Sequence, residues 1–184
     1  MNLEILLDMD GVITDFVNHY KRLFGYEHVV IDRPNMEECL GISSNEFWNN
    51  IDQTDTSFWA SMPLMPDAME IIGIVQKFDP NFCFSSSPSL CAGAGTGKIL
   101  ALQKHFGRGF TRYMIGKEKW RMSKPGVVLI DDFTINCDKF TGVKHYPGSA
   151  ILLPRPWNDN RHIEPLSYLE DWLEILSARC REGR

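Results

Sequence analysis

Three short stretches of this chain place acidic or hydroxyl side chains directly after apolar runs: Asp8 with Asp10, the serine run Ser85–Ser87, and Asp131 with Asp132. A charge at the end of a buried strand is costly unless another group compensates it. Side chains at the carboxyl ends of parallel strands meet at one crevice, however far apart they lie in the sequence. The pattern therefore predicts a single polar site assembled from three distant segments.

Clustered carboxylates of this kind suit phosphoryl-transfer chemistry. They repel one another and resist ionisation, and a hard divalent cation such as Mg²⁺ relieves that repulsion. One carboxylate can attack phosphorus and form an aspartyl-phosphate, while a second carboxyl group protonates the leaving oxygen and later activates water. The cation and a lysine would neutralise the oxygens of the transferring group. Taken one at a time, the DxD, SSSP and DD stretches are each typical of turns or helix caps, so the prediction depends on their combination.

Apolar runs and helical periodicities alternate along the chain, which is typical of an α/β fold. Strands are expected at Leu3–Leu7, Asn81–Ser85, Arg112–Ile115, Val127–Ile130 and Ser149–Leu153. Strands that alternate with helices form a parallel sheet with helices on both faces, a Rossmann-like three-layer core. The polar stretch over residues 16–75 breaks this rhythm and is interpreted as a small helical cap inserted after the first strand. Residues 1–15 and 76–184 would then make up the core.

Helices are expected where apolar residues recur every three or four positions. The ranges are Asp15–Phe24, Asn35–Leu40, Ser44–Ile51 with Ser44 as N-cap, a helix from Pro66 or Asp67 to Phe78, Lys98–Phe106, and Pro165–Arg181. The glycine-rich AGAGTG is expected to form the turn before Lys98. In the last helix, Trp172, Ile175 and Leu176 are expected to face the core.

The composition favours an ordinary globular protein of the cytoplasm. The 184 residues suit one domain with an insertion, and 43% apolar residues are enough for a substantial core. The sequence has no apolar run of about 18 residues and no signal-like N-terminus, so neither a membrane span nor secretion is expected. Five cysteines without a CxxC pair suggest reduced thiols. The net charge of −5 argues against broad nucleic-acid binding.

DMDGV near the N-terminus, SSSP in the middle and LIDD further on resemble the motifs of the haloacid dehalogenase (HAD) superfamily of phosphohydrolases. The closer resemblance is to the 5′(3′)-deoxyribonucleotidase family, in its cytosolic and mitochondrial forms. It covers most of the chain, through DMDGVITDF, FWASMPLMPDA, FCFSSSP, GKILALQKHFG and VVLIDD. It implies the HAD fold, Mg²⁺ as cofactor, a nucleotide as substrate and, because members are often dimers, a homodimer.

The resemblance also implies a role for each polar residue of these motifs. Asp8 would be the nucleophile and a metal ligand. Asp10 would be the general acid/base and would offer the metal its backbone carbonyl. The Ser86–Ser87 pair would bind phosphate. Asp132 would coordinate Mg²⁺ directly, and Asp131 would support the site from beside it.

The family's motif lysine precedes the last acidic motif, and here Lys117, Lys119 and Lys124 are all candidates. Lys119 matches best, in a segment that is longer here than in the relatives. Lys98 lies where the family often keeps another lysine, so it is a candidate for contact with phosphate or nucleotide. Phe133 follows LIDD where relatives carry a basic residue, which weakens any transfer of nucleotide specificity.

In the relatives, aromatic residues of the cap pack against the base, and Phe16, Phe58 and Trp59 are the candidates here. Trp59 could equally be a core aromatic at the hinge between cap and core. Aromatic faces stack on any base, so these residues do not decide which base is bound.

AGAGTGKI resembles a phosphate-binding loop, but Ala92 replaces the first glycine and Ile99 replaces the Ser or Thr that such loops require. An ATP site is therefore not expected. The expected function is Mg²⁺-dependent hydrolysis of nucleoside monophosphates, with pyrimidine deoxyribonucleotides as the first candidates. The alternatives are a HAD phosphatase for another small phosphate ester, a phosphatase for the end of a polynucleotide, and a non-enzymatic binding protein.

Overall fold

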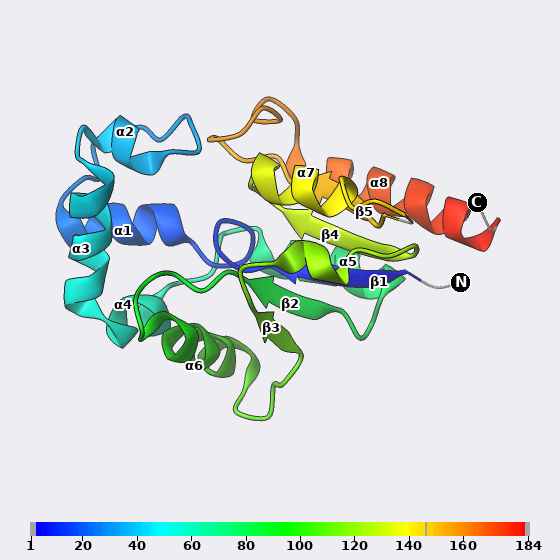
Figure 1. Cartoon of the computed structure of the whole chain (residues 1–184), viewed down its shortest axis with the longest axis horizontal. Helices are drawn as coiled ribbons and strands as arrows, with labels where there is room; N and C mark the ends of the chain where they lie inside the picture. Colours follow the sequence, from blue (N-terminus) through cyan, green and yellow to red (C-terminus); the bar gives the residue numbers. More distant parts are fainter. Residues whose placement is uncertain (1–2, 146, 183–184) are drawn as a thin grey trace.

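The computed structural model describes residues 3–145 and 147–182, and in this part of the chain five parallel strands form one sheet with the order β3-β2-β1-β4-β5 (Figure 1). The predicted parallel α/β fold is confirmed, because every strand lies within two residues of its predicted position. The strands are β1 (Glu4–Asp8), β2 (Cys83–Ser86), β3 (Tyr113–Ile115), β4 (Val127–Asp131) and β5 (Ser149–Leu152).

Helices connect these strands, and the longest connection follows β1. Five helices lie between β1 and β2: α1 (Phe16–Phe24), α2 (Met36–Leu40), α3 (Ser44–Thr54), α4 (Thr56–Ser61) and α5 (Ala68–Phe78). The later ones are α6 (Ala94–Phe106), the 3₁₀ helix η1 (Lys119–Met122), α7 (Thr134–Thr141) and α8 (Pro165–Arg181). Among the described residues, no helix has the length and apolar character that crossing a membrane requires.

The pleat of the sheet sends alternate side chains into two helical layers. One face carries Ile5 and Leu7, which belong to a cluster with apolar residues of α5 and α8. The opposite face carries Leu6 and Leu129, which pack with Phe140 of α7. In agreement with this arrangement, α5 contacts α8, and α7 contacts both β4 and β5. The helices cover the faces of the sheet, so its carboxyl edge is available for polar side chains.

The first four helices form a second hydrophobic cluster beyond the carboxyl ends of the strands (Figure 1). Tyr20 of α1, Phe47 of α3 and Phe58 of α4 are among its buried members. This cluster confirms the helical cap after the first strand. By contrast, Ile71 and the other buried residues of α5 belong to the core cluster. We therefore propose that the cap consists of α1 to α4 and ends before α5, rather than at residue 75.

Two predicted details of the helices are wrong. The N-cap of α3 is Ser43 rather than Ser44, because the hydroxyl of Ser43 accepts a hydrogen bond from the backbone N–H of Glu46 at 3.1 Å. In α8, Trp172 is 38% exposed and Ile175 is 42% exposed, so neither faces the core as predicted. The spacing of three leucines, four and then three residues apart, gives α8 its buried face instead: Leu169, Leu173 and Leu176.

The predicted glycine turn before Lys98 is also wrong, because α6 begins at Ala94 and includes Gly95 and Gly97. The reason is the close packing of α6 against α4. A Cβ atom on Gly97 would lie 2.5 Å from the Cβ of Trp59. Glycine is therefore needed at this position to let the two helices approach, and not to make a turn.

Candidate active site

Three acidic side chains meet at the carboxyl edge of the sheet. Asp8 ends β1, Asp131 ends the neighbouring strand β4, and Asp132 follows it. One carboxylate oxygen from each lies within 4.8 Å of the other two, and all three residues are buried. The structure thus brings together, from two neighbouring parallel strands, residues that are more than a hundred positions apart in sequence.

Lys119 is the lysine that reaches this cluster. Its Nζ atom lies 2.5 Å from Oδ1 of Asp8 and 2.7 Å from Oδ2 of Asp131. Lys124 instead forms an exposed ion pair with Glu4 at 2.9 Å, and Lys117 is exposed. Burial would lower the pKa of Lys119, but Asp8 and Asp131 outweigh it and raise the pKa above its ordinary value. Lys119 is therefore a fixed positive charge beside Asp8.

One ammonium group does not balance three buried carboxylates. Burial raises the pKa of Asp8 well above its ordinary value of 3.8, and Asp131 adds to this rise while Lys119 opposes it. Burial and Asp131 likewise raise the pKa of Asp132 to about 7, against the hydrogen bond from Trp157. A donor set of carboxylate oxygens with excess negative charge fits a hard divalent cation such as Mg²⁺.

Asp131 is the most completely held member of the cluster. Besides Lys119, it accepts a hydrogen bond from the backbone N–H of Phe133 at 3.0 Å and contacts Nδ2 of Asn136 through both carboxylate oxygens at 3.1 Å. These donors come from the start of α7 and the residue before it. Because both oxygens of Asp131 already have donors, its position suits orienting Lys119 rather than meeting a substrate.

Asp10 belongs to a second group of contacts, beside the cluster. Its Oδ2 atom lies 2.5 Å from Nζ of Lys98 and 3.1 Å from the hydroxyl of Ser86, and its Oδ1 atom accepts a hydrogen bond from Thr14 at 3.3 Å. Lys98 also donates to Ser86 at 2.8 Å and to the backbone oxygen of Ser87 at 2.6 Å. The DMDGV loop, the end of β2 and α6 are thus tied together by one buried amine.

The loop between Asp8 and Thr14 depends on Gly11. Its φ of +80° lies in the left-handed region, which favours glycine. A Cβ atom there would lie 2.3 Å from Oδ2 of Asp132. The glycine of DMDGV therefore serves two purposes, since it permits the turn and it leaves room for the acidic side chain opposite.

The segment after β5 adds residues to the site that the motifs did not identify. Trp157 donates its indole N–H to Oδ2 of Asp132 at 2.6 Å, and Asn158 donates to the backbone oxygen of Asp132 at 3.0 Å. Arg155 donates to the backbone oxygen of Gly11 at 2.7 Å and forms an ion pair with Asp67, also at 2.7 Å. The sequence did contain a signal for these residues, because Arg155 and Asn158 are polar residues that follow an apolar strand, as in the other motifs.

The three aromatic candidates of the cap lie close together but differ in exposure. Phe16 is half-buried and stacks with Trp59 at a ring distance of 5.7 Å. The Nζ atom of Lys98 lies 4.5 Å from the ring centre of Trp59, so this ring borders the Asp10 group. Phe58 is 1% exposed and packs edge-on against both rings. Trp59 is 2% exposed, so neither Phe58 nor Trp59 offers a free face to a base, and Phe16 is the accessible one of the three candidates.

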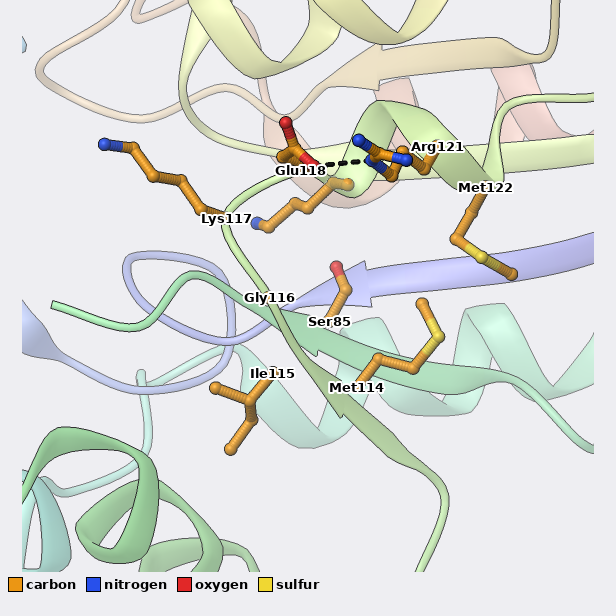
Figure 2. A pocket seen from close by; sticks show the side chains of 9 residues that line it. Ser85, Met114, Ile115, Gly116, Lys117, Glu118, Arg121 and Met122 are labelled. Atoms are coloured by element: carbon orange, nitrogen blue, oxygen red, sulfur yellow. Dashed lines mark hydrogen bonds and ion pairs between the residues drawn. The ribbon is translucent and has the colours of Figure 1, made fainter.

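A cavity of about 630 Å³ is lined by residues of β2, β3 and the segment that leads into η1 (Figure 2). Figure 2 shows the Ser85 side chain pointing toward the segment that carries Glu118 and Arg121. Met114 and Met122 form apolar parts of its wall. The three acidic side chains do not line this cavity, but Lys119 does, so the cavity adjoins the acidic cluster at Lys119.

Strand order and cap insertion give the chain the HAD fold, which a solved dehalogenase structure shares. More narrowly, it belongs to the family described as "5′ nucleotidase, deoxy (Pyrimidine), cytosolic type C protein", which matches residues 2–181. The predicted family resemblance is thereby confirmed, and the protein is a hydrolase of phosphate monoesters.

Solved structures resemble this one at low sequence identity. A structure described as a dehalogenase has a TM-score of 0.52 and 12% identity, covering 96% of this chain and 97% of that one. A hydrolase from Pseudomonas syringae has a TM-score of 0.48 and 14% identity, covering 91% and 90%. The L-2-haloacid dehalogenase from Xanthobacter autotrophicus has a TM-score of 0.46 and 11% identity, covering 97% and 88%. A direct comparison with curated proteins finds no match. The similarity to the dehalogenase structure supports the fold alone.

Proposed function

We propose that this protein is a Mg²⁺-dependent nucleotidase that hydrolyses deoxyribonucleoside monophosphates to nucleoside and phosphate. Family membership supports a nucleotide substrate. The observation that carries the proposal is the buried contact of Asp8 with Lys119, with Asp10 held two residues away on the same loop. This arrangement offers one carboxylate for attack and a second carboxyl group for proton transfer.

In the first step, an oxygen of Asp8 attacks phosphorus and the bond from phosphorus to the nucleoside oxygen breaks. The product is an aspartyl-phosphate on Asp8, and Asp10 gives its proton to the departing oxygen. Lys119 holds Oδ1 of Asp8 at 2.5 Å, which orients the carboxylate and leaves its other oxygen for the attack. Lys119 also adds positive charge where the transferring group gains negative charge.

In the second step, Asp10, now ionised, takes a proton from a water molecule, and that water attacks phosphorus. The bond to Asp8 breaks, phosphate leaves and both carboxyl groups return to their starting state. Lys98, Ser86 and Thr14 fix the Asp10 carboxylate through hydrogen bonds, so it faces the same bond in both steps.

The metal would be held by Asp8, Asp132 and the backbone carbonyl of Asp10, with Asp131 in support. A bound Mg²⁺ supplies positive charge that brings an anionic phosphate next to anionic carboxylates. The raised pKa values of Asp8 and Asp132 support this assignment, because they reflect a cluster that lacks positive charge.

The base is proposed to rest against Phe16, with the buried ring of Trp59 stacked behind it. The indole N–H of Trp59 is buried and has no hydrogen-bond partner among the described residues, so the cap would have to shift before a substrate could reach it. Ser86, Ser87 and Lys98 would bind the phosphate. The cap beside the carboxyl edge supports a small substrate over a polynucleotide end.

The compartment and assembly state are also part of the proposal. The five cysteines are all free thiols, which supports a reducing compartment such as the cytoplasm. A homodimer is proposed from the family resemblance, and light scattering on the purified protein would test it.

Phosphate release from a panel of nucleoside monophosphates, sugar phosphates and a 5′-phosphorylated oligonucleotide tests the proposed activity. We expect the deoxyribonucleotides to be the best substrates, with activity lost in EDTA and restored by Mg²⁺. Asp8→Asn should lower kcat by at least about a thousandfold, as removal of a nucleophile does in other enzymes. The control is Asp138→Asn, at an exposed position of α7, which should retain full activity.

Three results would overturn parts of this proposal. Full turnover in EDTA would exclude a requirement for Mg²⁺. Activity of Asp8→Asn within about tenfold of the wild type would exclude the nucleophile. A sugar phosphate or the oligonucleotide as the best substrate would replace the proposed substrate class with one of the alternatives.

A further inference from the structure

We propose that Trp157 is a positioning residue that holds Asp132 as a ligand through one oxygen and thereby makes the site selective for Mg²⁺ over Ca²⁺. The inference rests on the proposed Mg²⁺ site. It concerns a residue that takes no part in either step of the reaction described above and that lies on the segment after β5.

The geometry confines one oxygen of Asp132. The indole N–H of Trp157 donates to Oδ2 at 2.6 Å, and the ring is 8% exposed. On the other side, the Cα of Gly11 comes so close that a Cβ atom would lie 2.3 Å from the same Oδ2. Among the described residues, Oδ1 of Asp132 has no hydrogen-bond donor. The side chain therefore has one occupied oxygen and one free oxygen.

The chemical character of the donor matters here. An indole N–H donates a hydrogen bond but cannot accept one and cannot bind a cation. Trp157 therefore occupies one acceptor site of Oδ2 and disfavours its use as a second metal ligand, without offering another ligand in its place. A serine or a histidine at this position could itself coordinate the metal.

The position of Trp157 is fixed from both sides in sequence. Asn158 donates to the backbone oxygen of Asp132 at 3.0 Å and to that of Leu153 at 2.8 Å. Arg155 binds the backbone oxygens of Gly11 and Val12 at 2.7 and 3.0 Å. These contacts hold the segment that carries Trp157, and burial of the ring limits rotation of the indole away from Asp132.

A single available oxygen discriminates between the two cations. Mg²⁺ requires near-octahedral geometry at about 2.0–2.1 Å and usually keeps several water ligands. Ca²⁺ takes six to eight oxygen ligands at about 2.3–2.6 Å and accepts bidentate carboxylates. Without the indole donor, Asp132 could turn and offer both oxygens, which favours the larger ion.

Calorimetric binding of Mg²⁺ and Ca²⁺ to the whole protein, without substrate, tests the inference. Trp157→Phe keeps an aromatic ring and loses the donor. We expect its Kd for Mg²⁺ to rise roughly 10–100-fold, as for other groups that orient metal ligands. We expect its Kd for Ca²⁺ to change less than about threefold, so the Ca²⁺ to Mg²⁺ ratio of Kd values falls. Trp172→Phe, on exposed α8, is the control and should leave both values unchanged.

Replacement of Trp157 by 3-benzothienylalanine provides a second variant with nearly the full shape of tryptophan and a sulfur in place of the N–H. It should show the same loss of Mg²⁺ preference, even where the smaller phenylalanine perturbs folding. An unchanged ratio of Kd values in this variant would overturn the role of Trp157. A wild-type protein that binds no Mg²⁺ would instead overturn the proposed metal site, so the two failures are distinguishable.

Discussion

The Nζ atom of Lys98 lies 2.5 Å from Oδ2 of Asp10, although the two residues are 88 positions apart in sequence. Lys98 is 1% exposed and reaches Asp10 from α6, beneath the ring of Trp59. This buried ammonium holds the proposed acid/base and also donates to the hydroxyl of Ser86 and the backbone oxygen of Ser87. The connection between cap, α6 and the DMDGV loop is therefore electrostatic as well as apolar.

Lys98→Met should lower kcat/KM for nucleotides by about a hundredfold, because Asp10 loses its charged partner and general acid–base catalysis is typically worth that much or more. Steady-state kinetics would measure the effect. Lys104→Met, on the exposed side of the same helix, is the matched control. Equal kinetics for the two variants would contradict a role for Lys98 in the reaction.

Gly11→Ala should remove activity and destabilise the fold. The left-handed φ of +80° costs an alanine about 1–2 kcal/mol, and the new Cβ also collides with Asp132. Gly25→Ala separates these two effects, because Gly25 has a φ of +78° and no atom within 4 Å of such a Cβ. We expect a moderate loss of thermal stability with normal activity in Gly25→Ala. Similar activity in both variants would show that contact with Asp132 is unimportant.

Asp132→Asn should change the pH dependence of stability in the metal-free protein. The pKa of Asp132 is raised from 3.8 to about 7, so the folded state binds this proton more tightly than the unfolded state. The resulting stabilisation is complete below the unfolded pKa and is lost as pH rises through about 7. Asparagine does not ionise, so the Tm of Asp132→Asn relative to the wild type should increase between about pH 4 and pH 8.

Thermal unfolding in EDTA across this pH range would measure the effect of Asp132→Asn. The exposed Asp171 of α8 supplies the control, because Asp171→Asn should give a constant difference in Tm at every pH. A constant difference for Asp132→Asn as well would mean that the carboxyl group titrates normally in the folded protein.

Trp59→Leu should raise KM for nucleotides more than KM for a simple aryl phosphate, because Phe16, the proposed base contact, loses the ring on which it stacks while the phosphate contacts remain. Parallel kinetics on both substrates would measure this. Leucine keeps an apolar side chain beside Gly97, where α4 and α6 touch. Equal losses on the two substrates would show that Trp59 acts only in packing.

Local patterns in the sequence were sufficient for the sheet and its acidic edge. The apolar runs that end at Asp8 and Asp131 form adjacent strands. Local patterns could indicate this shared edge because short buried strands in an alternating α/β chain have few possible arrangements. The same reasoning located α8 from Pro165 to Arg181. It could not orient α8, since Trp172 is as apolar as the leucines that the sheet buries.

Long-range contacts decided the remaining features. The family resemblance favoured Lys119 over Lys117 and Lys124, and the path of η1 is what brings Lys119 to Asp8 and Asp131. The need for glycine at Gly97 comes from α4, a helix more than thirty residues earlier in the sequence that packs against α6. The role of Trp157 comes from the Asp132 carboxylate, which follows another strand. A residue's chemical type and its neighbours in sequence indicate what it can do. The partners that it meets depend on how distant segments pack, which no local pattern encodes.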